Sequence, residues 1–331
     1  MKPRVVCTGP FPGTALARLA AHVDLWVGPE EGTPREQLLR EGREAEGLIC
    51  GLLSDRIDAG LLAGLPKLRI VATPTAGTDH IDLGAARERG LWVCHVPEAT
   101  TEATADLAFA LILAVARRVV EGDRLVRSGG FHSWRSSLLL GVELSGAVLG
   151  VIGAGRIGQA VLRRGAGFGM ALRYTRLGGP LPALAGSFGA RFQPLPELLA
   201  ESDVVSLHVP LRPETRHLID AAALARMRRD AILVNTSRGS VVDEAALAAA
   251  LSQGRLRGAG IDVFEHEPDV HPGILASDRV VLTPHVGSAT EATRARMIEG
   301  AVAAVEAVLL DHGEPRGAVV RPAKGLDLPK S

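Results

Sequence analysis

The sequence is poor in several features that would each mark a class of protein. Its 331 residues include only three cysteines, Cys7, Cys50 and Cys94, and none of them forms a C-x-x-C pair. An odd and scattered set of this kind argues against a disulfide framework and against a zinc site. No other cluster with the spacing of metal ligands is visible, so we predict no metal. All three cysteines lie in or beside apolar runs, which favours buried thiols in a reducing cytoplasm.

Charge of one sign and long apolar segments are also missing. Lys+Arg and Asp+Glu both number 37, so the formal net charge is zero and nothing indicates a nucleic-acid partner. The longest uncharged apolar run, Leu107 to Ala116, is about half of what a membrane span needs. The first residues offer no apolar segment for a signal peptide. We therefore expect a soluble, cytoplasmic protein with no membrane partner.

What the chain does contain is a double series of strand-like and helix-like stretches. A length of 331 residues favours two domains. Aromatic residues make up only 3%, so the cores must be built from Ala, Leu and Val. Each series predicts an α/β fold, in which a doubly wound parallel sheet carries helices on both faces. The strand-like runs are Arg4 to Thr8, Val23 to Val27, Gly47 to Cys50, Arg69 to Ala72 and Trp92 to His95, then Val148 to Ile152, Ala171 to Tyr174, Val204 to Val209, Ala231 to Asn235, Gly260 to Phe264 and Val280 to Thr283.

Two long helical patterns flank the second series. The first covers about Thr101 to Ser128, and the second covers Ala289 to Leu310. The second series itself contains six strand-like runs, which is a complete doubly wound set. A polar, Pro-containing tail follows the last helix.

The glycine-rich segment 153–158 stands between a strand-like run and a helix-like run. Gly153, Gly155 and Gly158 have the G-x-G-x-x-G spacing of a dinucleotide-binding loop, with Arg156 and Ile157 inside it. The first glycine permits a tight turn, the second lets the backbone approach a pyrophosphate, and the third permits close helix packing. The pyrophosphate would then lie at the positive end of a helix. We predict a nicotinamide dinucleotide here.

The end of the next strand bears on the choice between NAD(H) and NADP(H). Sites for NAD usually place Asp or Glu there to bind the ribose 2′-hydroxyl. This sequence has Thr175 and Arg176, and no acid follows before Glu197. A hydroxyl and an arginine suit a 2′-phosphate, which favours NADP(H). NAD(H) remains possible if Arg176 is only a solvated loop residue.

Three residues with chemical potential follow three late strands. They are Arg238, Glu267 and His285. The carboxyl ends of parallel strands border the ligand crevice, so these side chains are expected to converge. Histidine can donate a proton near neutral pH, and a neighbouring carboxylate favours imidazolium and orients the ring. Arginine binds a carboxylate and polarises a keto oxygen. Together they point to hydride and proton transfer to a 2-keto acid.

These motifs resemble the D-isomer-specific 2-hydroxyacid dehydrogenases, closest to the glyoxylate/hydroxypyruvate reductase branch. The resemblance extends from about Leu68 to Met297. It implies a substrate domain of residues 1–98 and 288–331, a Rossmann domain of residues 99–287, and an active site in the cleft between these domains. Within that site Arg238, Glu267 and His285 would be catalytic, and Asp262 would face the nicotinamide carboxamide or only cap its strand.

The resemblance also carries further residues. Ala76 and Gly77 would bind the substrate carboxylate through their amides, unless they form an ordinary turn, and Thr75 and Thr78 replace bulkier residues there. A homodimer is implied, in which Trp134 either approaches the partner's substrate or packs locally. The remaining cofactor contacts implied are Thr104, Val209, Pro210, Thr236, Ser237, Arg238, His285 and Gly287. Thr104 has a helix-start hydroxyl as its alternative, and 209–210 a plain turn.

The expected function is the NAD(P)H-dependent reduction of glyoxylate or hydroxypyruvate to the D-2-hydroxy acid. Dehydrogenases of the same family for 2-ketogluconate, phosphoglycerate or phosphite remain alternatives. Formate dehydrogenase is disfavoured, because removing a hydride from formate needs no proton transfer. A dinucleotide-sensing binding protein of the same fold is a further alternative, which the complete Arg, Glu and His set argues against.

Overall fold

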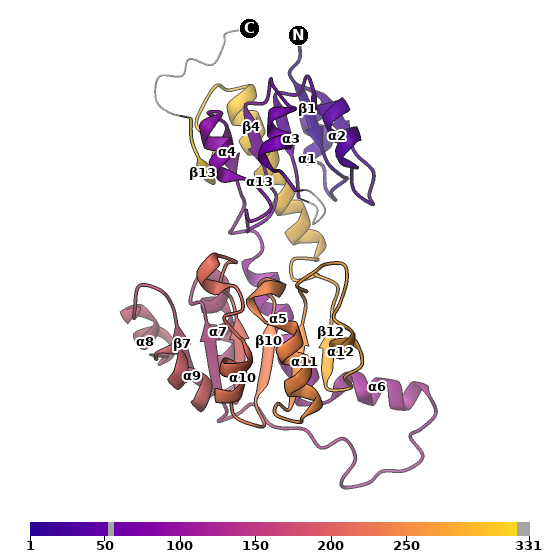
Figure 1. Cartoon of the computed structure of the whole chain (residues 1–331), viewed down its shortest axis with the longest axis vertical. Helices are drawn as coiled ribbons and strands as arrows, with labels where there is room; N and C mark the ends of the chain where they lie inside the picture. The colour runs from indigo at the N-terminus through magenta and orange to yellow at the C-terminus, as the bar shows by residue number, and fades with distance from the viewer. Residues whose placement is uncertain (52–55, 323–331) are drawn as a thin grey trace. The chain divides into compact units, whose positions relative to one another are not determined.

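The computed structural model describes residues 1–51 and 56–322, and the chain divides into two compact units. Unit 1 consists of Met1–Thr100 and Ser288–Ser331, and unit 2 consists of Thr101–Gly287. Each unit is an α/β structure built around one sheet (Figure 1). No helix among the described residues is both long and apolar enough to cross a membrane.

The sheet of unit 1 has the order β13-β5-β4-β3-β1-β2. Five of its strands are parallel, as the alternating pattern predicts: β1 (Arg4–Cys7), β2 (Asp24–Val27), β3 (Gly47–Ile49), β4 (Ile70–Ala72) and β5 (Trp92–Cys94). The sixth strand, β13 (Ala318–Val320), pairs antiparallel with β5. It lies in the segment predicted to be only a tail. Three residues at a sheet edge are too short for a period-2 pattern, so the sequence did not reveal this strand.

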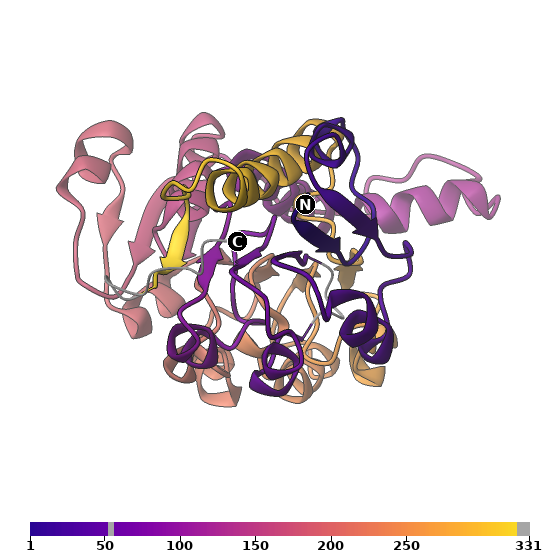
Figure 2. The same cartoon turned by 90° about the horizontal axis from the view of Figure 1, so that it is seen from above.

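Helices cover both faces of this sheet. One face carries α1 (Ala15–Ala20) and α13 (Glu291–Leu309), and the other carries α2 (Arg35–Gly42), α3 (Ala59–Ala63) and α4 (Leu83–Glu88). Figure 2 shows α13 lying along its face, with α2, α3 and α4 on the opposite side of the sheet. Successive strand residues pack into opposite cores, because side chains alternate between the two faces of a strand: Val5 packs on the α13 side and Val6 packs on the other side.

The sheet of unit 2 has seven parallel strands in the order β12-β11-β10-β9-β6-β7-β8. The prediction of six strands was therefore one short. The strand that the sequence did not reveal is β8, which has only two residues and a single apolar side chain. The strands are β6 (Val148–Ile152), β7 (Ala171–Thr175), β8 (Arg191–Phe192), β9 (Val204–Leu207), β10 (Ile232–Asn235), β11 (Gly258–Ile261) and β12 (Val280–Leu282).

The helices of unit 2 also form two layers. One apolar core joins α5 and α7 to the sheet, and a second joins α9, α10 and α11 to the opposite face. The helices are α5 (Thr101–Ala116), α6 (Val119–Arg127), α7 (Arg156–Gly167), α8 (Pro182–Phe188), α9 (Leu195–Glu201), α10 (Ala221–Arg226), α11 (Glu244–Ser252) and α12 (Pro272–Leu275), with the 3₁₀ turns η1 (Pro213–Thr215) and η2 (Gly239–Val241).

The single long helix expected over Thr101 to Ser128 is wrong. The chain forms α5 and α6 with a break between them, where Arg118 adopts a left-handed φ of 54°. The carbonyl of Ala116 at the end of α5 instead accepts a hydrogen bond from the amide of Val142. A break at one residue leaves the helical period on each side intact, so the apolar pattern could not show it.

Candidate active site

The glycine loop lies at the carboxyl edge of the unit 2 sheet, between β6 and α7. Gly153 has a φ of 100° and donates its amide hydrogen to the Thr175 carbonyl at 2.9 Å. A Cβ on Gly153 would lie 2.6 Å from the carbonyl of His208, and one on Gly158 would lie 2.1 Å from that of Gly153. Both positions therefore require glycine. A Cβ on Gly155 would meet nothing within 4 Å, so this residue borders open space.

The first turn of α7 is suited to an anion. Gly155 caps the helix without a side-chain bond, and the amides of Ile157 and Gly158 have no acceptor within the described part of the chain. Free amides at the positive end of a twelve-residue helix bind phosphate oxygens well. These residues therefore fit the pyrophosphate of a dinucleotide, with Arg156 on the exposed side of the turn.

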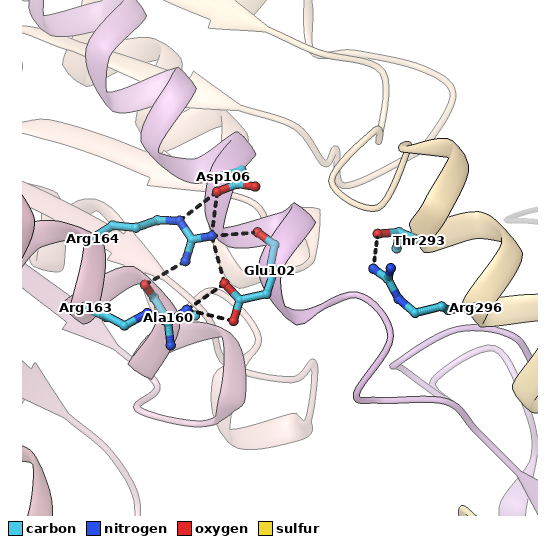
Figure 3. Close-up of polar contacts among 7 residues, drawn as sticks. All are labelled: Glu102, Asp106, Ala160, Arg163, Arg164, Thr293 and Arg296. Atoms are coloured by element: carbon cyan, nitrogen blue, oxygen red, sulfur yellow. Dashed lines mark hydrogen bonds and ion pairs between the residues drawn. The ribbon is translucent and has the colours of Figure 1, made fainter.

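Helix α7 is tied to α5 by charged hydrogen bonds (Figure 3). Arg164 donates from Nε to Asp106 Oδ1 at 2.8 Å and from Nη2 to Glu102 Oε2 at 2.9 Å. Arg163 donates to the same Glu102 carboxylate, and this bond is the main cause that lowers the pKa of Glu102. These contacts fix the position of α7, which follows the glycine loop, relative to α5, which carries the buried Thr104.

The strand ends next to the glycine loop carry the other residues predicted for the adenosine half. Thr175 is bonded to Gly153 through its carbonyl, and the exposed Arg176 follows it directly. Val209 follows β9, and its Cγ1 would lie 2.9 Å from a Cβ on Gly153. Pro210 comes next and is exposed. These residues thus lie at the ends of β7 and β9, the two strands that flank β6.

Arg238 follows β10 and is positioned by Asn235. The Asn235 side chain donates to the Arg238 carbonyl at 2.9 Å and accepts from the amide and the hydroxyl of Ser237. Gly239 packs directly on the backbone of Phe264, because a Cβ there would lie 1.9 Å from the Phe264 carbonyl carbon. The loop after β10 therefore touches the loop after β11, which carries Glu267.

Thr236, between these anchored residues, has a buried hydroxyl with no described partner. An orphaned hydroxyl of this kind is costly unless something binds it. It makes no hydrogen bond within residues 1–51 and 56–322, so it is available to a ligand at this strand edge.

Asp262 organises the loop that follows β12. It is buried, and its carboxylate accepts hydrogen bonds from the Thr283 hydroxyl at 2.6 Å and the amides of Val286 and Gly287 at 2.8 and 2.9 Å. Burial nevertheless raises the pKa of Asp262, and the hydrogen bonds oppose that rise. A Cβ on Gly287 would lie 3.2 Å from Asp262 and 3.4 Å from Thr104, so these three residues meet at one point.

His285 lies in that loop with a left-handed φ of 53°. Its amide donates to the Asp262 carbonyl at 2.8 Å, which fixes this uncommon backbone conformation. Its Nδ1 lies 2.9 and 3.1 Å from the two carboxylate oxygens of Glu267. Glu267 is itself held by the amide of Phe264 at 2.9 Å. Both side chains are largely buried, with 26% and 16% of their surface exposed.

The predicted substrate loop lies in unit 1, after β4. The carbonyls of Ala76 and Gly77 are both occupied, the first by His95 Nδ1 at 2.9 Å and the second by the Thr75 hydroxyl at 2.6 Å. The Thr75 hydroxyl also lies 2.8 Å from that of Thr73. Among the described residues the amides of Ala76 and Gly77 have no acceptor. The loop therefore presents donors and hides its acceptors, as an anion site requires.

Trp134 is not brought to any of these residues. It lies in the segment after α6, which extends away from the rest of unit 2, and 80% of its surface is exposed. Phe131 and Leu140 in the same segment are also more than half exposed.

Several positioning residues had no role in the sequence analysis. Asn235, Thr283 and His95 act through hydrogen bonds to other site residues, which depend on tertiary structure. Their one signal in the sequence is that each lies at or just beyond the end of a strand-like run.

Comparison with known proteins gives a consistent result. A family model described as D-isomer specific 2-hydroxyacid dehydrogenase, NAD binding domain, matches residues 109–287. The chain is 46% identical over 302 residues to a glyoxylate reductase of Korarchaeum cryptofilum, and the match covers 90% of each chain.

Solved structures extend this similarity to the fold. The TT0316 protein from Thermus thermophilus is 47% identical with a TM-score of 0.89, over 96% of this chain and all of that one. An NADPH-dependent glyoxylate/hydroxypyruvate reductase from Sinorhizobium meliloti, in complex with NADP and malonate, is 30% identical with a TM-score of 0.86. That match covers 98% of this chain and 99% of the other.

Proposed function

The chain belongs to the D-isomer specific 2-hydroxyacid dehydrogenases, which are NAD(P)-dependent oxidoreductases, and we propose that it reduces glyoxylate or hydroxypyruvate to the D-2-hydroxy acid. The observation that carries this proposal is the bond between His285 Nδ1 and the Glu267 carboxylate at 2.9 Å. A reduction of a keto group needs a proton donor beside the hydride donor, and this pair is suited to that task.

In this proposal His285 donates the proton to the keto oxygen. Because Nδ1 is bonded to Glu267, Nε2 is the nitrogen left to face the substrate. Glu267 stabilises the imidazolium before the transfer and fixes the ring orientation. Arg238 binds the substrate and stabilises the negative charge that develops on the keto oxygen. The amides of Ala76 and Gly77 bind the substrate carboxylate.

The proposed cofactor is a nicotinamide dinucleotide, with NADP(H) preferred and NAD(H) possible, and it supplies the hydride when bound. Gly153, Gly155, Arg156, Ile157 and Gly158 would hold the pyrophosphate. Thr175 and Arg176 would bind the 2′-phosphate. The remaining contacts we propose are Thr104, Val209, Pro210, Thr236, Ser237, Arg238, Asp262, His285 and Gly287. On this basis residues 99–287 form the dinucleotide domain, and residues 1–98 and 288–331 form the substrate domain.

Asp262 acts mainly as a positioning residue in this proposal. Both of its carboxylate oxygens are already bonded to the loop of residues 283–287. Its backbone carbonyl accepts from the amide of His285, and its carboxylate accepts from the amide of Gly287, which would face the nicotinamide half of the cofactor.

We also propose a two-fold homodimer. The exposed apolar side chains of Phe131, Trp134 and Leu140 gather on one projecting segment, and isolated domains rarely leave such groups in water. In the dimer, Trp134 would approach the substrate of the partner.

A panel assay tests the proposed reaction and cofactor together. Glyoxylate, hydroxypyruvate, pyruvate and 2-ketogluconate are each offered with NADPH and with NADH. We expect the highest kcat/KM for glyoxylate or hydroxypyruvate with NADPH. Absence of turnover with every acid would overturn the reaction. A tenfold preference for NADH, about 1.4 kcal/mol, would overturn the role of Arg176.

A further inference from the structure

Arg294 is a charged residue on the apolar face of a helix. It lies in the first turn of α13, and the residues three, four and seven positions later are all buried: Met297, Ile298 and Ala301. Residues at these spacings share one face of a helix. Arg294 therefore points with the core-facing side chains of α13 rather than with the solvent-facing ones.

The helix places Arg294 at the carboxyl edge of the unit 1 sheet. Further along α13, Val305 and Leu309 pack on Gly47 at the start of β3, and the Val308 carbonyl accepts a bond from Arg69 just before β4. The helix thus runs antiparallel to these strands. Arg294 lies eleven residues before Val305, about 16 Å along the helix, whereas strands of three residues span about 10 Å.

Two contacts confirm that the beginning of α13 reaches this edge. Ala295 lies beside Gly13, in the loop after β1, where a Cβ would be 3.4 Å away. On the other side, Gly300 packs against Val96, whose amide donates to the Thr75 carbonyl in the substrate loop. Arg294 therefore belongs to the same edge as Ala76 and Gly77.

The guanidinium of Arg294 makes no hydrogen bond or ion pair within residues 1–51 and 56–322. Partial burial lowers the pKa of Arg294, and no carboxylate in the described part of the chain opposes that effect. Arginine nonetheless stays charged at neutral pH. A partly buried cation without a counterion is costly to the fold, which indicates that an anion binds it.

We propose that Arg294 and the amides of Ala76 and Gly77 together bind the carboxylate of the substrate. This inference rests on the proposed reduction of a 2-keto acid and adds a residue to it. Arg294 supplies the charge, and the two amides supply directional donors. Arg238 is then left to interact with the keto oxygen, so one arginine serves binding and the other serves the reaction.

The test compares Arg294→Met with Arg296→Met. Arg296 lies in the same helix, is exposed and bonds to Thr293 at 2.9 Å (Figure 3), so it serves as a matched control. We expect Arg294→Met to raise the KM for glyoxylate by about 10- to 100-fold, the range of a charge-assisted hydrogen bond, with a smaller change in kcat. Arg296→Met should change neither constant. Arg294→Lys should fall between Arg294→Met and the unsubstituted protein.

Two further measurements separate binding from structure and from the reaction. Arg294→Met should leave the melting temperature unchanged or higher, because it removes an unpaired charge. It should also weaken the binding of oxalate, measured by calorimetry without turnover. A lower melting temperature with unchanged oxalate affinity would overturn the proposal. If no keto acid is reduced yet Arg294→Met weakens oxalate binding, the carboxylate site stands and the proposed reaction fails.

Discussion

The two units share a parallel sheet but equip its carboxyl edge differently. In unit 2 the edge carries side chains fixed by other groups, such as His285 by Glu267 and Asp262 by the loop of residues 283–287. In unit 1 the side chains of Thr75 and His95 bond to the carbonyls of Gly77 and Ala76, and the amides of Ala76 and Gly77 have no acceptor within the described residues. Proton transfer requires an oriented titratable group, whereas binding an anion requires only donors and charge. Changes to His285 or Glu267 in unit 2 should therefore lower kcat, and changes to the substrate loop of unit 1 should raise the KM for the keto acid.

The largest expected effect lies in unit 2. His285→Ala should lower kcat by about 100-fold or more, equivalent to about 2.7 kcal/mol, because it removes the proposed proton donor. Steady-state kinetics with glyoxylate measures this, and a fluorescence titration should show that NADPH still binds. His266→Ala, an exposed histidine next to Glu267, is the control and should retain activity. Near-normal turnover of His285→Ala would contradict the role of His285.

The sequence predicted the parts of the molecule that depend on local pattern. Parallel strands and their helices follow from apolar periodicity. The G-x-G-x-x-G spacing predicted the roles of Gly153 and Gly158, and the structure leaves no room for a Cβ at either position. Apolar periodicity did not predict the break at Arg118, nor did it predict the short strands β8 and β13. Each of these depends on one or a few residues whose conformation is set by tertiary contacts.

The candidate site also contains residues that the sequence could predict and residues that it could not. Arg238, Glu267 and His285 could be named because each follows a strand in a parallel sheet. The groups that hold them could not, because Asn235, Thr283 and the left-handed backbone of His285 acquire their roles only through hydrogen bonds across loops. Arg294 is the clearest case that the sequence could not reveal. In the sequence it is an ordinary charged residue of a helix, and its place at the carboxyl edge of the unit 1 sheet follows only from the direction of α13.

An intermediate effect should appear in the stability of unit 2 at low pH. His208, after β9, bonds through Nε2 to the Ser206 hydroxyl, and its Nδ1 is buried. Burial lowers the pKa of His208 from 6.5 to about 3. A lowered pKa gives stability that is present above 6.5 and is lost as the pH falls toward 3, because the unfolded state binds the proton first. The loss should approach about 1.4 kcal/mol per pH unit from this residue.

Urea unfolding from pH 7 to pH 4.5 measures this loss. His208→Leu should flatten the pH dependence, whatever its effect at pH 7. In a Trp134→Phe background the remaining tryptophans, Trp26 and Trp92, belong to unit 1, so fluorescence follows unit 1 while circular dichroism follows both units. An equal slope for His208→Leu and its parent would show that His208 does not set the acid sensitivity.

The smallest expected effect lies in the substrate loop of unit 1. Thr75→Val removes the donor to the Gly77 carbonyl, and one hydrogen bond of about 1 kcal/mol corresponds to about a fivefold rise in the KM for glyoxylate. Because the loop only binds, kcat should stay within twofold. Thr78→Val is the matched control, since the Thr78 side chain makes no bond in the part of the chain that the structure describes.

The changes in kcat and in KM of Thr75→Val, taken together, decide whether the two units differ as proposed. A loop that merely orients donors loses affinity when it loosens, and the proton transfer at His285 proceeds unchanged once the acid is bound. If Thr75→Val lowered kcat as strongly as it raised KM, the substrate loop would contribute to the transition state itself. The division between a binding edge in unit 1 and a reacting edge in unit 2 would then be wrong.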